Sequence, residues 1–171
     1  AKETQRTELS HIHSLRHEAS QDYVRMDAAT RKNLEIDSNL SGGENHTLFS
    51  VLNGTATSMG ARLLRRWLKQ PLKNQQAIEH RLQAVGEIDL SGQSEHYQEL
   101  LKPIGDMERI LARIALRSAR PRDLSRLQLS LAQLPLLQQA FNGCQAQLLQ
   151  DLLTNIGQFD AIDQLLQRAV I

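Results

Sequence analysis

The stretch TSMGARLLRRWLKQ, residues 57–70, carries the clearest structural signal in the sequence. Its apolar residues recur at spacings of three and four, the period of one face of an α-helix, and basic residues fill the positions between them. Trp67 falls on the same side as Leu63, so we expect it to lie in the core. Thr57 or Ser58 can cap the first turn. The segment therefore predicts an amphipathic helix.

The same period recurs on both sides of this helix. Asp27 can cap a helix that continues through Ile36, Asn74 and Asp106 can each cap a further helix, and Pro121 suits the first turn of another. Apolar stripes at helical spacing accompany these starts: Ile78, Leu82, Val85 and Ile88; Met107, Ile110, Leu111 and Ile114; Leu124, Leu127, Leu131 and Leu134; Leu148, Leu149, Leu152, Leu153 and Ile156; and Ile162, Leu165, Leu166 and Val170.

Strand patterning is nearly absent. No alternation of period two extends beyond four residues, and an extended piece is expected only over residues 23–26. Pro135 should kink or break the leucine-rich helix that contains it. The sequence therefore predicts an all-α fold, an irregular multi-helix bundle with short connections over residues 27–171. An extended linker over residues 1–26, with a helical turn or two, should precede it.

Composition narrows the class of protein. The 171 residues are 40% hydrophobic, and 20 Lys and Arg balance 19 Asp and Glu. One domain with a sizeable core fits these values, whereas a disordered tail or a basic nucleic-acid arm does not. No apolar run is long enough to span a membrane, and no signal peptide is visible. The single Cys144 fits a reducing compartment. A start without Met and an apolar end suggest a piece cut from a longer protein.

Catalytic and metal-binding motifs are missing from the sequence. It contains no phosphate-binding G-x-x-x-x-G-K-[ST] loop, no H-E-x-x-H pair, no G-x-S-x-G turn and no pair of cysteines for zinc. His11, His13 and His17, with Glu18 and Asp22 nearby, form the best metal-ligand cluster, but exposed histidines explain it better. We therefore predict no catalytic residue, no cofactor and no metal in this chain.

Two stretches are rich in arginine. Residues 57–81 contain six Lys and Arg against one acid, and residues 109–126 contain six Arg against one acid. A solvated or partner-facing surface is the favoured interpretation, because arginine stems cover apolar surface and their heads pair with carboxylates. The alternative is a helical module that contacts nucleic-acid phosphates non-specifically. The candidate residues for that contact are Arg62, Arg65, Arg66 and Lys69.

Longer ordered motifs resemble the MutS family of DNA mismatch-repair proteins. They are MDAATRKNLEI at 26–36, T-x-M-G-x-R-L-L-R-x-W-L at 57–68 with Pro71 and Leu72 after it, I-x-x-R-L-x-A-V at 78–85, D-M-E-R-I-L-x-R at 106–113 and A-x-P-R-D-L at 119–124; Thr4-Gln5-Arg6 is similar to the end of the family's connector. The motif residues expected to set packing and orientation are Asp27, Asn33, Leu34, Glu35, Met59, Gly60, Arg62, Leu63, Trp67, Leu68, Pro71, Asp106, Glu108, Arg109, Ile110, Leu111, Arg113, Pro121, Arg122, Asp123 and Leu124.

The resemblance implies a place within a larger machine. In that family a mismatch-reading domain and a connector precede a helical core with lever helices, a clamp embraces DNA, and an ATPase domain dimerises. This chain resembles the connector–core junction and the first part of the core. It has neither the mismatch-reading Phe-x-Glu motif nor a Walker A sequence. The implied role is a non-catalytic core segment that couples clamp to ATPase in a cytoplasmic bacterial protein, with ATP, magnesium and DNA bound by other parts of the parent.

The resemblance also implies an oligomer. The parent is expected to be a dimer, and its returning lever helices would cover the leucine faces of residues 148–153 and 162–170. Those helices are missing from this sequence, so the leucine faces should be exposed. Exposed apolar patches of this kind tend to be buried by association. We therefore expect the isolated chain to self-associate.

Overall fold

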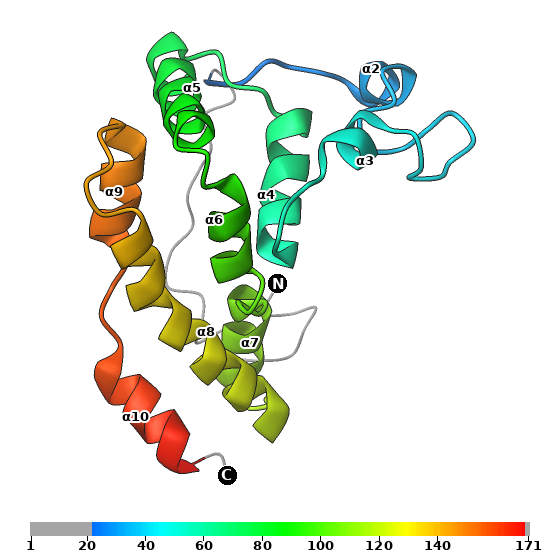
Figure 1. The fold of residues 1–171 in the computed structure, drawn as a ribbon. Coiled ribbons are helices and arrows are strands. Elements are labelled where there is room, and N and C mark those ends of the chain that lie inside the picture. The colour runs from blue at the N-terminus through cyan, green and yellow to red at the C-terminus, as the bar shows by residue number, and fades with distance from the viewer. Residues whose placement is uncertain (1–21, 170–171) are drawn as a thin grey trace.

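The computed structural model describes residues 22–169, and the regular elements in this part of the chain are helices, as predicted (Figure 1). The helices are α2 (Ala28–Asn33), α3 (Leu48–Leu52), α4 (Ser58–Lys69), α5 (Gln75–Leu90), α6 (Ser94–Leu101), α7 (Met107–Ala115), α8 (Pro121–Ala140), α9 (Gln147–Asn155) and α10 (Asp160–Ala169). The described residues form no strand, only an isolated bridge between Tyr23 and Leu72. That bridge confirms the short extended piece near residue 23.

Within the described residues, helix α8 is the central helix of the domain and contacts three others. Helices α6 and α7 pack on it from one side and α10 from another, while α9 packs against α5 and α3 against α4 (Figure 1). Helices α2 and α3 project from the rest of the molecule. The domain is therefore elongated. The α5–α9 pair lies near the C-terminal end of α8, and α7 and α10 lie near its N-terminal end.

The apolar core is divided to match this shape. One cluster, Ala84, Ala146 and Leu149, lies between α5 and α9. The other, Ile110, Leu127 and Leu166, joins α7, α8 and α10. Because the body is thin, most helices bury only part of their apolar stripe, and many large apolar side chains stay exposed.

The predicted helix starts are confirmed. Side-chain oxygens of Asp27, Thr57, Asn74 and Asp106 accept hydrogen bonds from backbone amides three residues ahead, at 2.6, 3.0, 2.9 and 3.3 Å. Pro121 occupies the first turn of α8, where its missing N–H costs nothing. These caps satisfy amides that the first helical turn cannot pair internally.

The helix after Asp27 is shorter than predicted. It ends at Asn33, and Glu35 takes a left-handed backbone conformation with φ of 46°. The carbonyl oxygens of Glu35 and Ile36 then accept hydrogen bonds from the first amides of α3, at 2.9 and 2.8 Å. Ile36 is buried beneath that contact. Packing onto α3 therefore prevails over the local helical pattern.

Three further expectations about packing need correction. Helix α8 continues through Pro135, so the predicted break does not occur, and neighbouring helices pack on both sides of that position; a kink there stays a prediction. On α7 only Ile110 is buried, and Leu111 and Ile114 face outward, since α8 covers a single side of this helix. On α4 no residue is fully buried: Leu63 is 47% exposed and Trp67 39%.

Candidate functional site

A polar junction joins the start of α4 to the start of α7. The carboxylate of Asp106 accepts hydrogen bonds from Arg62 Nη1 and Nη2, at 2.6 and 2.8 Å, and from Ser58 Oγ, at 3.1 Å. It also accepts the Arg109 amide as the cap of α7. Arg62 Nη2 further donates to Glu108 at 2.6 Å. One carboxylate thus holds two helices that are more than forty residues apart in sequence.

The electrostatics of this junction follow from its geometry. The Arg62 hydrogen bonds, assisted by the Arg109 amide and Ser58, lower the pKa of Asp106 to about 2, against an opposing effect of burial. The same contacts raise the pKa of Arg62. The Asp106 side chain is 17% exposed, whereas that of Glu108 is 71% exposed. Asp106 is therefore the principal partner of Arg62.

A second bidentate pair joins α7 to α8. Arg113 Nε and Nη2 donate to the two oxygens of Asp123 at 3.0 and 2.8 Å. The same carboxylate accepts the Arg120 amide at 3.0 Å and so caps α8. The Arg120 amide and Arg113 together lower the pKa of Asp123. The turn between these helices is thus closed at both ends by one acid.

The basic residues in the second half of α4 pair with carboxylates from another segment of the chain. Arg65 donates to Glu44 at 3.0 and 3.3 Å, lies 3.7 Å from Asp37 and covers the Phe49 ring at 4.3 Å. Lys69 pairs with Asp37 at 2.6 Å. Asp37 and Glu44 lie in the segment between α2 and α3. These contacts bind the projecting α2–α3 region to α4.

The predicted phosphate contacts of α4 fall in this paired region. An open groove beside the helix is lined by Arg31, Arg62, Arg65, Arg66, Lys69 and Gln70. A phosphate entering it would compete with carboxylates already bound to three of the four predicted cations. The geometry favours the interpretation that arginine heads pair with carboxylates, and phosphate contact at this face stays a prediction.

Trp67 has a role that differs from the expected one. The guanidinium of Arg81, on α5, stacks over its ring at 3.8 Å from the centroid. A cation–π contact of this kind suits a half-exposed aromatic side chain. Trp67 therefore links α4 to α5 at the surface, where the sequence pattern predicted a core position.

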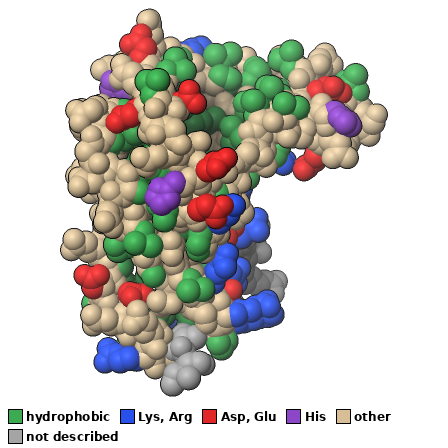
Figure 2. Space-filling view, viewed as in Figure 1, with side chains coloured by type: hydrophobic (Ala, Val, Ile, Leu, Met, Phe, Trp, Pro, Cys, Tyr) green, Lys and Arg blue, Asp and Glu red, His purple; other side chains and the backbone are tan. Residues whose placement is uncertain are grey.

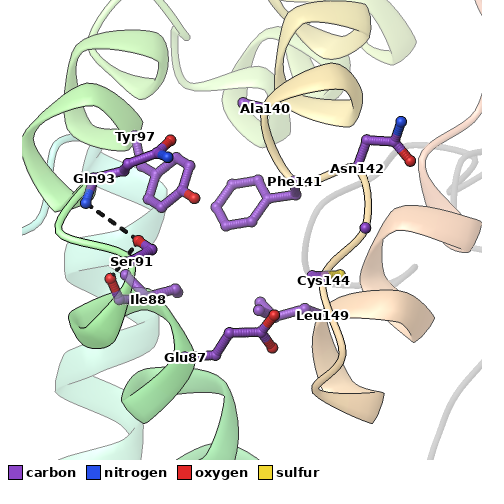
Figure 3. Close-up of a pocket in the computed structure, with 11 residues that line it drawn as sticks. Glu87, Ile88, Ser91, Gln93, Tyr97, Ala140, Phe141, Asn142, Cys144 and Leu149 are labelled. Atoms are coloured by element: carbon purple, nitrogen blue, oxygen red, sulfur yellow. Dashed lines mark hydrogen bonds between the residues drawn. The ribbon is translucent and has the colours of Figure 1, made fainter.

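A small cavity of about 190 Å³ lies between α5, α6 and the segment that connects α8 to α9 (Figure 3). Tyr97 and Phe141 stack across it, with ring centroids 4.2 Å apart. Glu87 accepts the amides of Gln145 and Ala146, just before α9, at 2.7 and 2.6 Å. Nothing in the sequence near Glu87 signalled this contact, because its partners lie 58 and 59 residues away.

The cavity and its surroundings show no catalytic arrangement. Burial, assisted by the charge of Glu87, raises the pKa of the Cys144 thiol, so the thiol is not activated. Residues 22–169 contain no group of three metal-ligating side chains. His11, His13, His17 and Glu18 lie outside the described residues. The motif side chains Arg62 and Asp106, and Arg113 and Asp123, instead pair with each other between helices.

These features define a helical domain in which ion pairs between sequence motifs join the helices. Residues 29–171 match the family description MutS domain III, so the chain belongs to the MutS family, as its motifs indicated. It is a core domain of MutS mismatch-repair proteins. Within the described part of the chain, no helix is long and apolar enough to cross a membrane.

Proposed function

We propose that this domain is a rigid coupling element, which fixes how the parts of a MutS protein on either side of it move together. One observation carries the proposal: the side chains of its most distinctive motifs bind each other. Arg62 pairs with Asp106 and Arg113 with Asp123, so the motifs at 57–68, 106–113 and 119–124 form one connected set. A binding or catalytic site would instead gather such groups around a cleft.

The ion pairs have a mechanical consequence. One bidentate guanidinium–carboxylate pair connects α4 to α7, another connects α7 to α8, and α10 packs along α8. Motion entering at α4 would therefore reach α10 without being absorbed by flexible connections. In this proposal ATP and magnesium bind elsewhere in the parent, and this domain transmits their state to the DNA clamp.

The test uses a full-length MutS protein that carries this domain. Asp106→Asn removes the charge that holds Arg62 and preserves the shape of the side chain. We expect basal ATP hydrolysis to persist, and the change in hydrolysis caused by mismatched DNA to fall at least several-fold. Glu108→Gln is the matched control, since its carboxylate is mostly exposed. If DNA coupling and the unfolding midpoint both survive Asp106→Asn, the proposal is wrong.

The structure shows which apolar residues of α9 and α10 are exposed and so available for the predicted self-association. Leu152 on α9 and Ile162 and Leu165 on α10 are exposed, whereas Leu149 and Leu166 of the same helices are buried. We propose that the isolated chain associates through the exposed residues. Light scattering over a wide concentration range tests this, and a monomer at every concentration would contradict it.

A further inference from the structure

A second basic surface lies where α7 turns into α8. We define the α7–α8 corner as Arg117, Arg120 and Arg122, all of which are exposed. Figure 2 shows Lys and Arg side chains along the right side of the lower half of the molecule. This corner belongs to neither the polar junction nor the groove beside α4.

The corner differs from α4 in its counter-charges. Among residues 22–169, the side chains of Arg117, Arg120 and Arg122 form no ion pair within 4.0 Å. The nearest acid in sequence, Asp123, already binds Arg113 and the Arg120 amide. Arg122 also interacts with the Asp123 carboxylate at longer range. Within residues 22–169, the corner therefore carries three positive charges that one shared acid offsets only in part.

The backbone of the corner is held in place. After α7 ends, Arg117 donates its amide to Ile114 at 2.9 Å, and Ser118 donates its amide to Arg113 at 2.9 Å. Arg117 adopts φ of 55°, a left-handed conformation that favours Gly or Asn. These two hydrogen bonds are those of a helix C-cap, in which the residue after the last turn is left-handed. The end of α7 therefore fixes the backbone of Arg117 and leaves its side chain exposed.

We propose that the α7–α8 corner binds the phosphate backbone of duplex DNA. Guanidinium groups match phosphate oxygens in a planar, two-pronged arrangement and stay charged at every working pH. Residues 106–140 contain no Phe, Tyr or Trp, so the corner offers no platform on which bases of a single strand could stack. Contact with the backbone alone predicts binding that ignores sequence and mismatch.

The experiment is a titration of labelled 30-base-pair duplex, matched and mismatched, with the 171-residue chain at 50 and 200 mM salt, followed by fluorescence anisotropy. The test variant is Arg117→Asn with Arg120→Gln and Arg122→Gln. Asn is chosen at 117 because it tolerates the left-handed backbone. The control variant, Lys32→Gln with Lys73→Gln and Arg168→Gln, removes the same charge from three exposed positions on α2, on the connection between α4 and α5, and on α10.

We expect the corner variant to bind duplex at least tenfold more weakly at 50 mM salt. The slope of log K against log salt should also become shallower by about 0.9 for each lost phosphate contact. The control variant should change the affinity several-fold less. Both variants are checked for an unchanged unfolding midpoint, so that a loss of binding is not a loss of fold.

Four results would overturn the proposal. One is the absence of duplex binding by the unmodified chain at 50 mM salt, and another is equal weakening by the corner and control variants. A third is discrimination between matched and mismatched duplex, which a backbone contact does not provide. The fourth is stronger binding of poly-L-glutamate than of duplex by the corner, which would assign the surface to an acidic protein instead.

Discussion

The basic face of α4 and the α7–α8 corner look alike in sequence and differ in the folded molecule. Each comes from a stretch with six basic residues and one acid. On α4, Arg62, Arg65 and Lys69 bind carboxylates supplied by other segments of the chain. At the corner the only local acid is already engaged. The density of basic residues in a stretch of sequence therefore does not reveal whether they form ion pairs within the fold or face solvent.

The largest effect on stability is expected when the ion pair between Arg62 on α4 and Asp106 is removed. Asp106→Asn in the isolated chain should lower the free energy of unfolding by about 2–3 kcal/mol, because it leaves Arg62 without its main partner and weakens the cap of α7. Urea denaturation measures this loss. Glu108→Gln, as the control, should cost less than about 1 kcal/mol, since exposed ion pairs contribute little.

Protonation of Asp106 at low pH should lower the free energy of unfolding of the unmodified chain, as the Asp106→Asn substitution does. Its pKa is lowered from 3.8 to about 2, so the ionised form stabilises the fold above pH 4, and this contribution is lost as the pH falls towards 2. The loss amounts to about 2 kcal/mol. The difference in unfolding free energy between the unmodified chain and Asp106→Asn should narrow over that interval. A constant difference between pH 4 and pH 2 would contradict the assignment.

A smaller effect is expected where the projecting region meets α4. Asp37 pairs with Lys69 and lies near Arg65, and its side chain is 15% exposed. Asp37→Asn should destabilise the chain by about 1 kcal/mol. Hydrogen exchange of the α2 and α3 amides would report it, because these helices should open more often while α8 keeps its protection. Faster exchange spread evenly over all helices would argue against a local fastener.

The smallest effect on stability is expected at the α7–α8 corner. Replacement of Arg117, Arg120 and Arg122 by Asn, Gln and Gln should leave the free energy of unfolding within about 0.5 kcal/mol of the unmodified chain, since surface substitutions without partners rarely do more. Asn adopts the left-handed backbone of residue 117 more readily than Arg, which favours a small gain in the free energy of unfolding. A loss of 2 kcal/mol in urea denaturation would show that these arginines also hold the fold.

Sequence reasoning succeeded where structure depends on neighbours along the chain. The caps at Asp27, Thr57, Asn74 and Asp106 were all predicted, because each hydrogen bond spans three residues. The apolar periods located the helices for the same reason. Burial was predicted less well: Trp67 and Leu111 belong to correct stripes but lie at the surface, since the stripe does not say how much of it a neighbouring helix covers.

The sequence by itself therefore determined the all-helical class, the helix starts and, through its ordered motifs, membership of the MutS family. Only the tertiary structure decided which charges are neutralised. Arg62 and Asp106 are 44 residues apart, and Glu87 reaches amides 58 and 59 residues away. Such pairs depend on how the helices pack, because a carboxylate and a guanidinium interact strongly only when packing brings them together and partly excludes water.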